Sequence, residues 1–195
     1  DVETEEEVAK FLQGTMDDCY LPWLLQGMKQ GVELLQREIV RGSNIRVIGD
    51  YDVDGVCSTY ILTEGLRQLG AKVDTAIPHR MKDGYGLNDN LIHEAYEAGV
   101  QCIVTCDNGI AAAPQVALAK ELGMKVVITD HHEVPFEECE GVKKEILPPA
   151  DVIIDPKQAA CEYPFKSICG GVVAYKFIQA LCQQMQYARS KELLR

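Results

Sequence analysis

The sequence lacks a long apolar run and an excess of positive charge. None of its 195 residues fall in an apolar stretch of about 18 or more, so the sequence predicts no transmembrane helix. No basic, apolar and small-residue segment of the kind found in secretory signal peptides opens the chain, and we expect a cytoplasmic protein. Acidic residues outnumber basic ones by 30 to 19, for a net charge of −11. This balance at first argues against a nucleic-acid-binding protein, because phosphate contacts require Lys and Arg.

The eight cysteines form no C-x-x-C pair and show no zinc-ligand spacing. Several of them lie inside apolar runs, so we expect reduced, mostly buried thiols. A chain of this length can bury a core without metals or disulfides, and we expect one domain with at most a small appendage.

The hydrophobic pattern changes at residue 45. Residues 1–44 have helical spacing, whereas five β-branched apolar runs follow at 45–50, 72–78, 101–107, 125–130 and 151–155. Their centres lie about 25 to 30 residues apart, the length of a βαβ unit. Strands with few polar residues indicate a sheet covered by helices on both faces. We therefore predict an α/β, doubly wound, mainly parallel sheet of five or more strands in residues 45–195, preceded by a helical segment in residues 1–44.

Aspartates end four of the five strand runs. In a parallel sheet the carboxyl ends of the strands lie along one edge, so these side chains can converge there. Crowded carboxylates repel one another and need a cation to persist. A helix cap is the alternative explanation for any single one of them. The four residues are Asp50, Asp107, Asp130 and Asp155.

The first strand end carries the motif G-D-Y-D-V-D-G, with Asp50, Asp52 and Asp54 at alternate positions. Three carboxylates on one turn indicate a divalent-metal site, because Mg²⁺ and Mn²⁺ favour oxygen ligands. The motif also matches the start of an EF-hand, but the required Glu is replaced by Ile61 and a strand precedes it. It further resembles the nucleophile turn of haloacid-dehalogenase-type phosphatases, an alternative that this motif alone leaves open.

Two later strand ends carry T-C-D-N-G-I, with Asp107, and I-T-D-H-H-E, with Asp130, His131 and His132. Adjacent side chains after a strand point in different directions, so one histidine can bind a metal while the other faces a substrate. A neighbouring carboxylate can fix the tautomer of an imidazole.

The ordered motifs D-Y-D-V-D-G, D-N-G and D-H-H resemble those of the DHH phosphoesterase superfamily. Within it, the segments 77–88 and 155–176 resemble RecJ-type single-strand-specific exonucleases. The resemblance implies a nuclease of DNA repair and recombination that hydrolyses single-stranded DNA from the 5′ end to nucleoside 5′-monophosphates. A small-nucleotide phosphodiesterase or pyrophosphatase of the same superfamily, or an inactive DHH binding scaffold, remains an alternative.

The same resemblance implies two Mn²⁺ or Mg²⁺ ions. Asp52 and Asp107 would hold one ion, and Asp54, Asp107 and His131 the other, with Asp50 in or next to this ligand set.

The resemblance also implies the residues that face the substrate. Asp130 would orient a histidine and His132 would face the scissile phosphate. Arg80, in the loop after the second strand, would bind phosphate, and Tyr85 would stack on a base.

Parts of such an enzyme are expected outside this sequence. The fourth metal-binding aspartate would follow the helix that begins near Gly171, and we expect Asp155 to be a strand-end cap rather than that ligand. A DHHA1 domain and an OB-type domain would complete the full-length chain, with single-strand-binding protein or a helicase as further partners. We expect this piece alone to be nearly inactive. Residues 45–157 carry a charge of −9, so the basic DNA-binding surface is expected mostly elsewhere.

Overall fold

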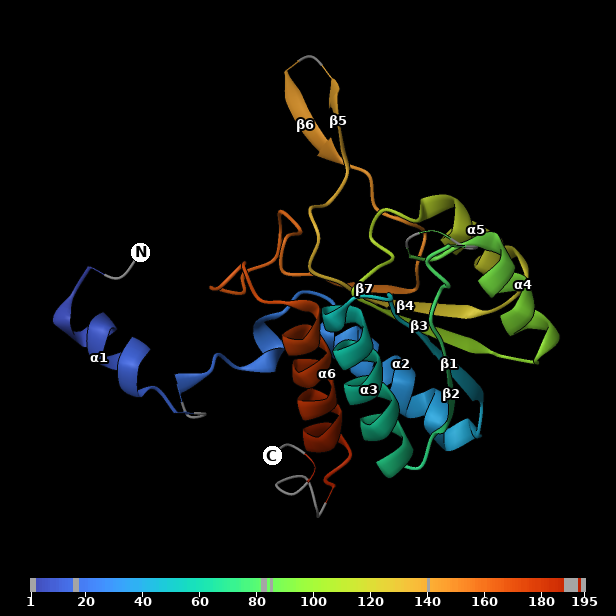
Figure 1. Ribbon diagram of the computed structural model, residues 1–195, viewed down its shortest axis with the longest axis horizontal. Coiled ribbons are helices and arrows are strands. Elements are labelled where there is room, and N and C mark those ends of the chain that lie inside the picture. Colours follow the sequence, from blue (N-terminus) through green and yellow to red (C-terminus); the bar gives the residue numbers. More distant parts are fainter. Residues whose placement is uncertain are drawn as a thin grey trace.

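A five-stranded parallel sheet forms the centre of the molecule (Figure 1). The computed structural model describes residues 3–15, 18–81, 84, 86–139, 141–187 and 193. The strand order is β2-β1-β3-β4-β7 and every neighbouring pair is parallel. The strands lie where the sequence predicts them, and the α/β fold is confirmed: β1 (Asn44–Ile48), β2 (Lys72–Ala76), β3 (Cys102–Cys106), β4 (Lys125–Thr129) and β7 (Val152–Ile154).

Helices cover both faces of the sheet. One apolar cluster packs beneath α2 (Met28–Arg41), α3 (Val53–Gln68) and α6 (Gly170–Gln184), and a second packs beneath α4 (Asp89–Glu97) and α5 (Ala113–Glu121). Alternate residues of β3 serve the two clusters, because successive side chains of a strand point to opposite faces. Val104 belongs to the first cluster and Ile103 to the second.

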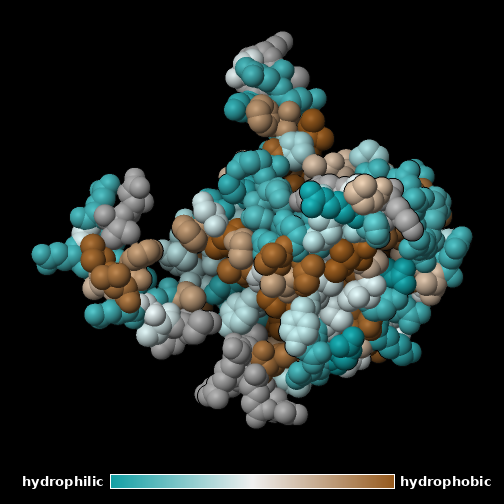
Figure 2. Space-filling model, in the orientation of Figure 1, coloured by the Kyte–Doolittle hydropathy of each residue, from teal (hydrophilic) through white to brown (hydrophobic). Residues whose placement is uncertain are grey.

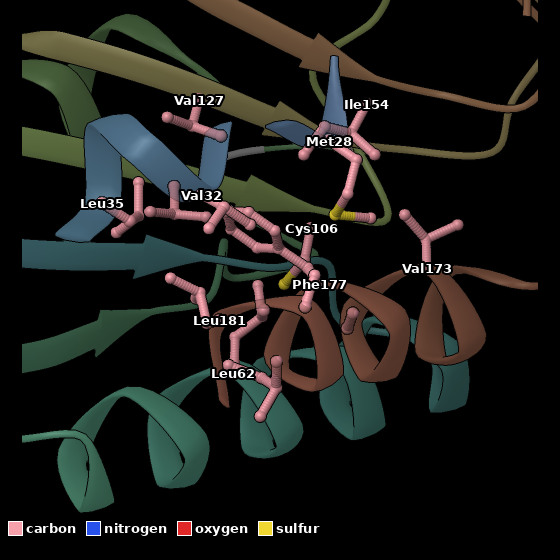
Figure 3. Packing of buried hydrophobic residues seen from close by; sticks show 14 of the residues in the cluster. Met28, Val32, Leu35, Leu62, Cys106, Val127, Ile154, Val173, Phe177 and Leu181 are labelled. Atoms are coloured by element: carbon pink, nitrogen blue, oxygen red, sulfur yellow. The ribbon is translucent and has the colours of Figure 1, made fainter. Parts of the chain in front are cut away.

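The first cluster brings α6 close to α3 and the sheet (Figure 3). Phe177 of α6 is fully buried in it. Gly65 permits the close approach of the two helices, since a Cβ there would lie 2.6 Å from Cδ1 of Ile178. This packing sets the position of the amino end of α6, which faces the carboxyl edge of the sheet.

The N-terminal segment has two different parts. Helix α1 (Glu5–Gln13) has a capping box of Thr4 and Glu7, yet it buries none of its residues. Figure 2 shows apolar side chains gathered on this projecting helix, and Phe11 is 77% exposed. After the 3₁₀ helix η2 (Pro22–Leu24), by contrast, α2 packs in the core. The division between residues 1–44 and 45–195 stays a prediction.

A β-hairpin that the sequence analysis did not predict lies between β4 and β7. Its strands are β5 (Phe136–Cys139) and β6 (Val142–Glu145), and it projects from the body (Figure 1). Glu137 pairs with Lys144 and Glu138 with Lys143 across the hairpin. Opposite charges support such cross-strand pairs. The pattern was not recognised because Glu137, Glu138, Lys143 and Lys144 interrupt the apolar alternation expected of a strand.

Seven cysteine side chains are described, and all are free thiols. The expectation that they are mostly buried holds for four of them, Cys102, Cys106, Cys161 and Cys182, whereas Cys19, Cys57 and Cys169 are exposed. Among the residues that the structure describes, no helix combines the length and apolar character needed to cross a bilayer.

Candidate metal centre

The strand-end aspartates are buried at the carboxyl edge of the sheet. Asp50 follows β1, Asp107 follows β3, Asp130 follows β4 and Asp155 follows β7, and none is more than 2% exposed. Because β1, β3 and β4 are neighbours in the sheet, their ends meet at one place. Burial of acidic side chains in this number requires hydrogen bonds or cations to compensate for lost hydration.

Three of the predicted ligands lie together. Nε2 of His131 is 2.9 Å from Oδ1 of Asp107 and 3.4 Å from Oδ2 of Asp54. The backbone of Asp107 has a φ of 59°, in the left-handed region, and its N–H donates to the carbonyl of Thr129. This conformation is uncommon outside glycine but is enriched for Asp and Asn.

Two glycines hold the carboxylate of Asp54. The N–H groups of Gly170 and Gly171, at the start of α6, donate to its Oδ2 and Oδ1 at 2.7 and 2.8 Å. A helix N-terminus favours a negative charge at this position. A Cβ on Gly170 would lie 2.9 Å from Oδ1 of Asp107, so glycine is required for this approach. The role of these two residues was not predicted from the sequence, although paired glycines before an apolar helix are a visible signal.

Asp130 connects the loop after β3 to both histidines. Its Oδ2 accepts a hydrogen bond from the N–H of Ile110, and its Oδ1 accepts from the N–H of His131. Oδ1 also lies 2.7 Å from Nδ1 of His132. This hydrogen bond raises the pKa of His132 to about 9. Asp130 therefore fixes the ring orientation of His132.

Asp50 and Asp52 flank the cluster in different ways. Oδ1 of Asp50 accepts from the N–H of Gly86 at 3.2 Å, while its buried Oδ2 has no hydrogen-bond partner in the described part of the chain. Asp52 is the N-cap of α3 and accepts from the N–H of Gly55. Asp52 is therefore a helix cap, which was the alternative explanation for a single aspartate at a strand end.

The electrostatics of the cluster fit a divalent cation. Burial raises the pKa of Asp107, the hydrogen bond with His131 lowers it, and the charges of Asp54 and Asp52 raise it again. The hydrogen bond to Asp107 raises the pKa of His131. Ligand atoms of Asp107, His131 and His132 lie within 4.8 Å of one another. Carboxylate oxygens suit Mn²⁺ and Mg²⁺, and Oδ2 of Asp50, which has no hydrogen-bond partner among the described residues, adds a further donor.

Asp155 is fully buried beside this cluster. Its Oδ1 accepts from the N–H of Lys157, which is the contact of a strand-end cap, and its Oδ2 has no hydrogen-bond partner among the described residues. Burial raises the pKa of Asp155 to about 7, and the nearby charge of Asp130 acts in the same direction. That Asp155 is not a metal ligand stays a prediction.

Of the two residues predicted to bind substrate, Arg80 and Tyr85, the structure describes only Arg80. The guanidinium carbon of Arg80 lies 5.5 Å from the ring centroid of Tyr51. Tyr85 falls outside the described residues. A cavity of about 270 Å³ opens beside His132, with Leu87, Ile110 and Gln115 among its lining residues.

Comparison with known families identifies the class of protein. The DHH family, N-terminal domain, matches residues 44–195, and the chain therefore belongs to the DHH family. The haloacid-dehalogenase alternative is thereby excluded.

Within this family, the chain is similar in sequence to single-stranded-DNA-specific exonucleases. The chain is 40% identical over 183 residues to the single-stranded-DNA-specific exonuclease RecJ of Bacillus subtilis, covering 94% of this chain and 22% of that relative. It is 36% identical over 182 residues to RecJ of Escherichia coli, covering 92% and 29%. The chain thus spans between a fifth and a third of the length of these relatives.

Solved structures show the same likeness. A crystal structure of exonuclease RecJ bound to manganese matches with a TM-score of 0.72 and 30% identity, over 87% of this chain and 42% of that one. RecJ from Thermus thermophilus in complex with Mn²⁺ matches with a TM-score of 0.71 and 26% identity, over 96% and 27%.

Proposed function

We propose that this chain is the catalytic DHH lobe of a longer, cytoplasmic RecJ-type exonuclease that acts in DNA repair and recombination. It would hydrolyse single-stranded DNA from the 5′ end to nucleoside 5′-monophosphates. The observation that carries this proposal is the convergence of three predicted ligands: Nε2 of His131 lies within 3.4 Å of carboxylate oxygens of both Asp54 and Asp107. The pair formed by Asp130 and His132 lies beside them. The relatives named as single-stranded-DNA-specific exonucleases supply the substrate class.

In this proposal two Mn²⁺ or Mg²⁺ ions are held by the aspartates and His131. Asp52 and Asp107 contribute to one site, and Asp54, Asp107 and His131 to the other, with Asp50 adjacent. Such a pair of ions supplies a nucleophilic water at neutral pH and charge stabilisation at phosphorus. The hydrogen bonds from Gly170 and Gly171 support this assignment, because they hold the carboxylate of Asp54 in one orientation.

His132 faces the scissile phosphate in the same proposal. Its Nδ1 contacts Asp130, so Nε2 is the ring nitrogen that is directed toward a substrate. The side chain is 44% exposed, which leaves room for a phosphate. The contact of Nδ1 with Asp130 fixes the orientation of the ring, which suits a contact between Nε2 and a phosphate oxygen.

The proposal places the rest of the DNA-binding surface outside this chain. The net charge of −11 is poorly suited to hold a DNA strand by itself. We propose that a DHHA1 domain and an OB-type domain of the full-length protein bind the strand, and that single-strand-binding protein or a helicase delivers it.

Asp107→Asn in the full-length protein tests the proposal. Asn tolerates the left-handed backbone of residue 107, so the fold is retained while one charged ligand is lost. We expect Mn²⁺-dependent release of mononucleotides from 5′-phosphorylated single strands to fall by at least about a hundredfold, since even outer-shell changes reduce metal-site activity about 10- to 100-fold.

The control is Asp151→Asn, at the other edge of the sheet, which should leave turnover unchanged. Faster turnover of dinucleotides or pyrophosphate than of long strands by the wild type would favour the small-nucleotide alternative. Robust degradation of DNA by the 195-residue chain alone would contradict the expectation that this lobe needs the other domains.

A further inference from the structure

Arg80 lies near the acidic motif that contains Asp50 and Asp52, and among the described residues it forms no ion pair with it. Three other arginines contact a carboxylate: Arg41 contacts Glu38, Arg46 contacts Asp74 and Arg67 contacts Glu64. Arg80 forms no such ion pair within the described residues, and its guanidinium lies over the ring of Tyr51.

Tyr51 occupies a fixed place at the carboxyl edge. It lies between Asp50, which is hydrogen-bonded by the N–H of Gly86, and Asp52, which caps α3. The side chains on either side of Tyr51 thus each accept a backbone hydrogen bond. The ring is half-buried, and its face lies 5.5 Å from the guanidinium carbon of Arg80.

The loop that carries Arg80 provides little support of its own. Arg80 and His79 are exposed, and the N–H of Met81 donates to Nδ1 of His79. A long side chain on such a loop would otherwise turn toward solvent or toward the nearby carboxylates. An ion pair with Asp50 or Asp52 would also neutralise charge that the metal centre requires.

The cation–π contact with Tyr51 holds Arg80 near the site without an ion pair to Asp50 or Asp52. A guanidinium that interacts through its face keeps its N–H donors at the edge of the plane, where they can bind a phosphate in bidentate geometry. We propose that Tyr51 is a positioning residue, which holds Arg80 over the carboxyl edge so that the guanidinium binds a phosphate group of the bound single strand. This inference rests on the proposed function.

A double-mutant cycle in the full-length protein tests the inference. The variants are Tyr51→Leu, Tyr51→Phe, Arg80→Ala and the double variant Tyr51→Leu/Arg80→Ala. The matched control is Tyr96→Leu, at an exposed tyrosine of α4. KM and kcat are measured with a 5′-phosphorylated single strand and Mn²⁺, and Mn²⁺ affinity is measured by calorimetry on the same proteins.

We expect Tyr51→Leu to raise KM up to about fivefold, with a much smaller change in kcat, because cation–π contacts of exposed side chains have about this strength. Tyr51→Phe, which keeps the ring face, should stay within about twofold of the wild type, as should Tyr96→Leu. Arg80→Ala should raise KM at least as much as Tyr51→Leu, and the double variant should be no worse than Arg80→Ala alone. Mn²⁺ affinity should not change.

Three results would overturn the inference. The first is that the effects of Tyr51→Leu and Arg80→Ala multiply in the double variant, and the second is that Tyr51→Phe is as damaging as Tyr51→Leu. The third is a loss of Mn²⁺ affinity in Tyr51→Leu, which would mean that Tyr51 acts on Asp50 or Asp52. A wild type that does not degrade the strand would overturn the proposed function as well, so the two failures are distinguishable.

Discussion

The aspartates at the two edges of the sheet differ in their partners. Asp151 precedes β7 at the amino edge, where it lies 2.5 Å from Nζ of Lys120 and 3.1 Å from Nζ of Lys125. Asp155 follows β7 at the carboxyl edge, where the N–H of Lys157 is the donor to its Oδ1. In the described part of the chain Asp155 forms no ion pair with lysine or arginine, and the same is true of Asp50 and Asp54.

The pKa values show the consequence. Burial raises the pKa of Asp151, but hydrogen bonds from Lys120, the N–H of Val126 and Lys125 outweigh it, and the net shift is downward. The pKa of Asp155 is instead raised to about 7. Asp151 is therefore neutralised by two lysines at the amino edge, whereas burial disfavours the charge of Asp155 at the carboxyl edge unless a proton or a further cation balances it. This difference separates Asp151, which ion pairs neutralise, from Asp155, which is buried at the edge that carries the predicted metal ligands.

Asp155→Asn should have the largest effect on stability. A carboxyl with a higher pKa in the folded state stabilises the fold fully below its unfolded pKa of about 4, and this contribution is lost as the pH rises through about 7. The metal-free variant should therefore be more stable than the wild type at pH 8, by about 2–4 kcal/mol, and equally stable at pH 4. Urea denaturation in EDTA at both pH values measures the difference.

Mn²⁺ affinity supplies the second readout for Asp155→Asn. An unchanged affinity agrees with a strand-end cap. Parallel stability curves for the two proteins would show that burial does not raise the pKa of Asp155. Weaker Mn²⁺ binding by the variant would show that Asp155 belongs with the metal ligands.

Gly170→Ala tests the backbone support of the carboxyl edge. The added Cβ would lie 2.9 Å from Oδ1 of Asp107 and 3.1 Å from Oγ of Ser58. Overpacking of this kind destabilises a protein by about 1–3 kcal/mol, and here it also displaces a predicted ligand, so we expect weaker Mn²⁺ binding by calorimetry.

Gly171→Ala is the matched control for this prediction. Its Cβ would approach Oδ1 of Asp54 to 3.3 Å, a smaller overlap, and its effect should be correspondingly smaller. Equal effects of the two alanines would indicate a loss of helix α6 as a whole rather than a clash with the cluster.

The strand positions and the acids that follow them were predictable from sequence. Buried parallel strands give continuous apolar runs, and chain direction alone places Asp50, Asp107 and Asp130 at one edge. The local motif D-H-H also indicated that an acid would orient a histidine, and the structure pairs Asp130 with His132.

Contacts between distant segments were not predictable in this way. Gly170 reaches Asp54 across 116 residues, because α6 docks against α3 at Gly65, and no local pattern encodes that packing. The contact of Tyr51 with Arg80 depends likewise on the path of an irregular loop. The hairpin carries charges on exposed strands, so it lacks the apolar alternation by which strands are recognised.

Asp151→Asn should have the smallest effect and the opposite pH dependence. Its lowered pKa means that the ion pairs stabilise the fold above about pH 4 and that this contribution is lost as the pH falls through the folded-state pKa. Because Lys120 and Lys125 are partly exposed, the variant should lose only about 1 kcal/mol at pH 7, measured by urea denaturation, and almost nothing near pH 2. Mn²⁺ affinity should be unchanged, since Asp151 is neutralised locally. A variant that binds Mn²⁺ more weakly would show that the two edges are coupled through β7, and the distinction between Asp151 and the acids of the carboxyl edge would then fail.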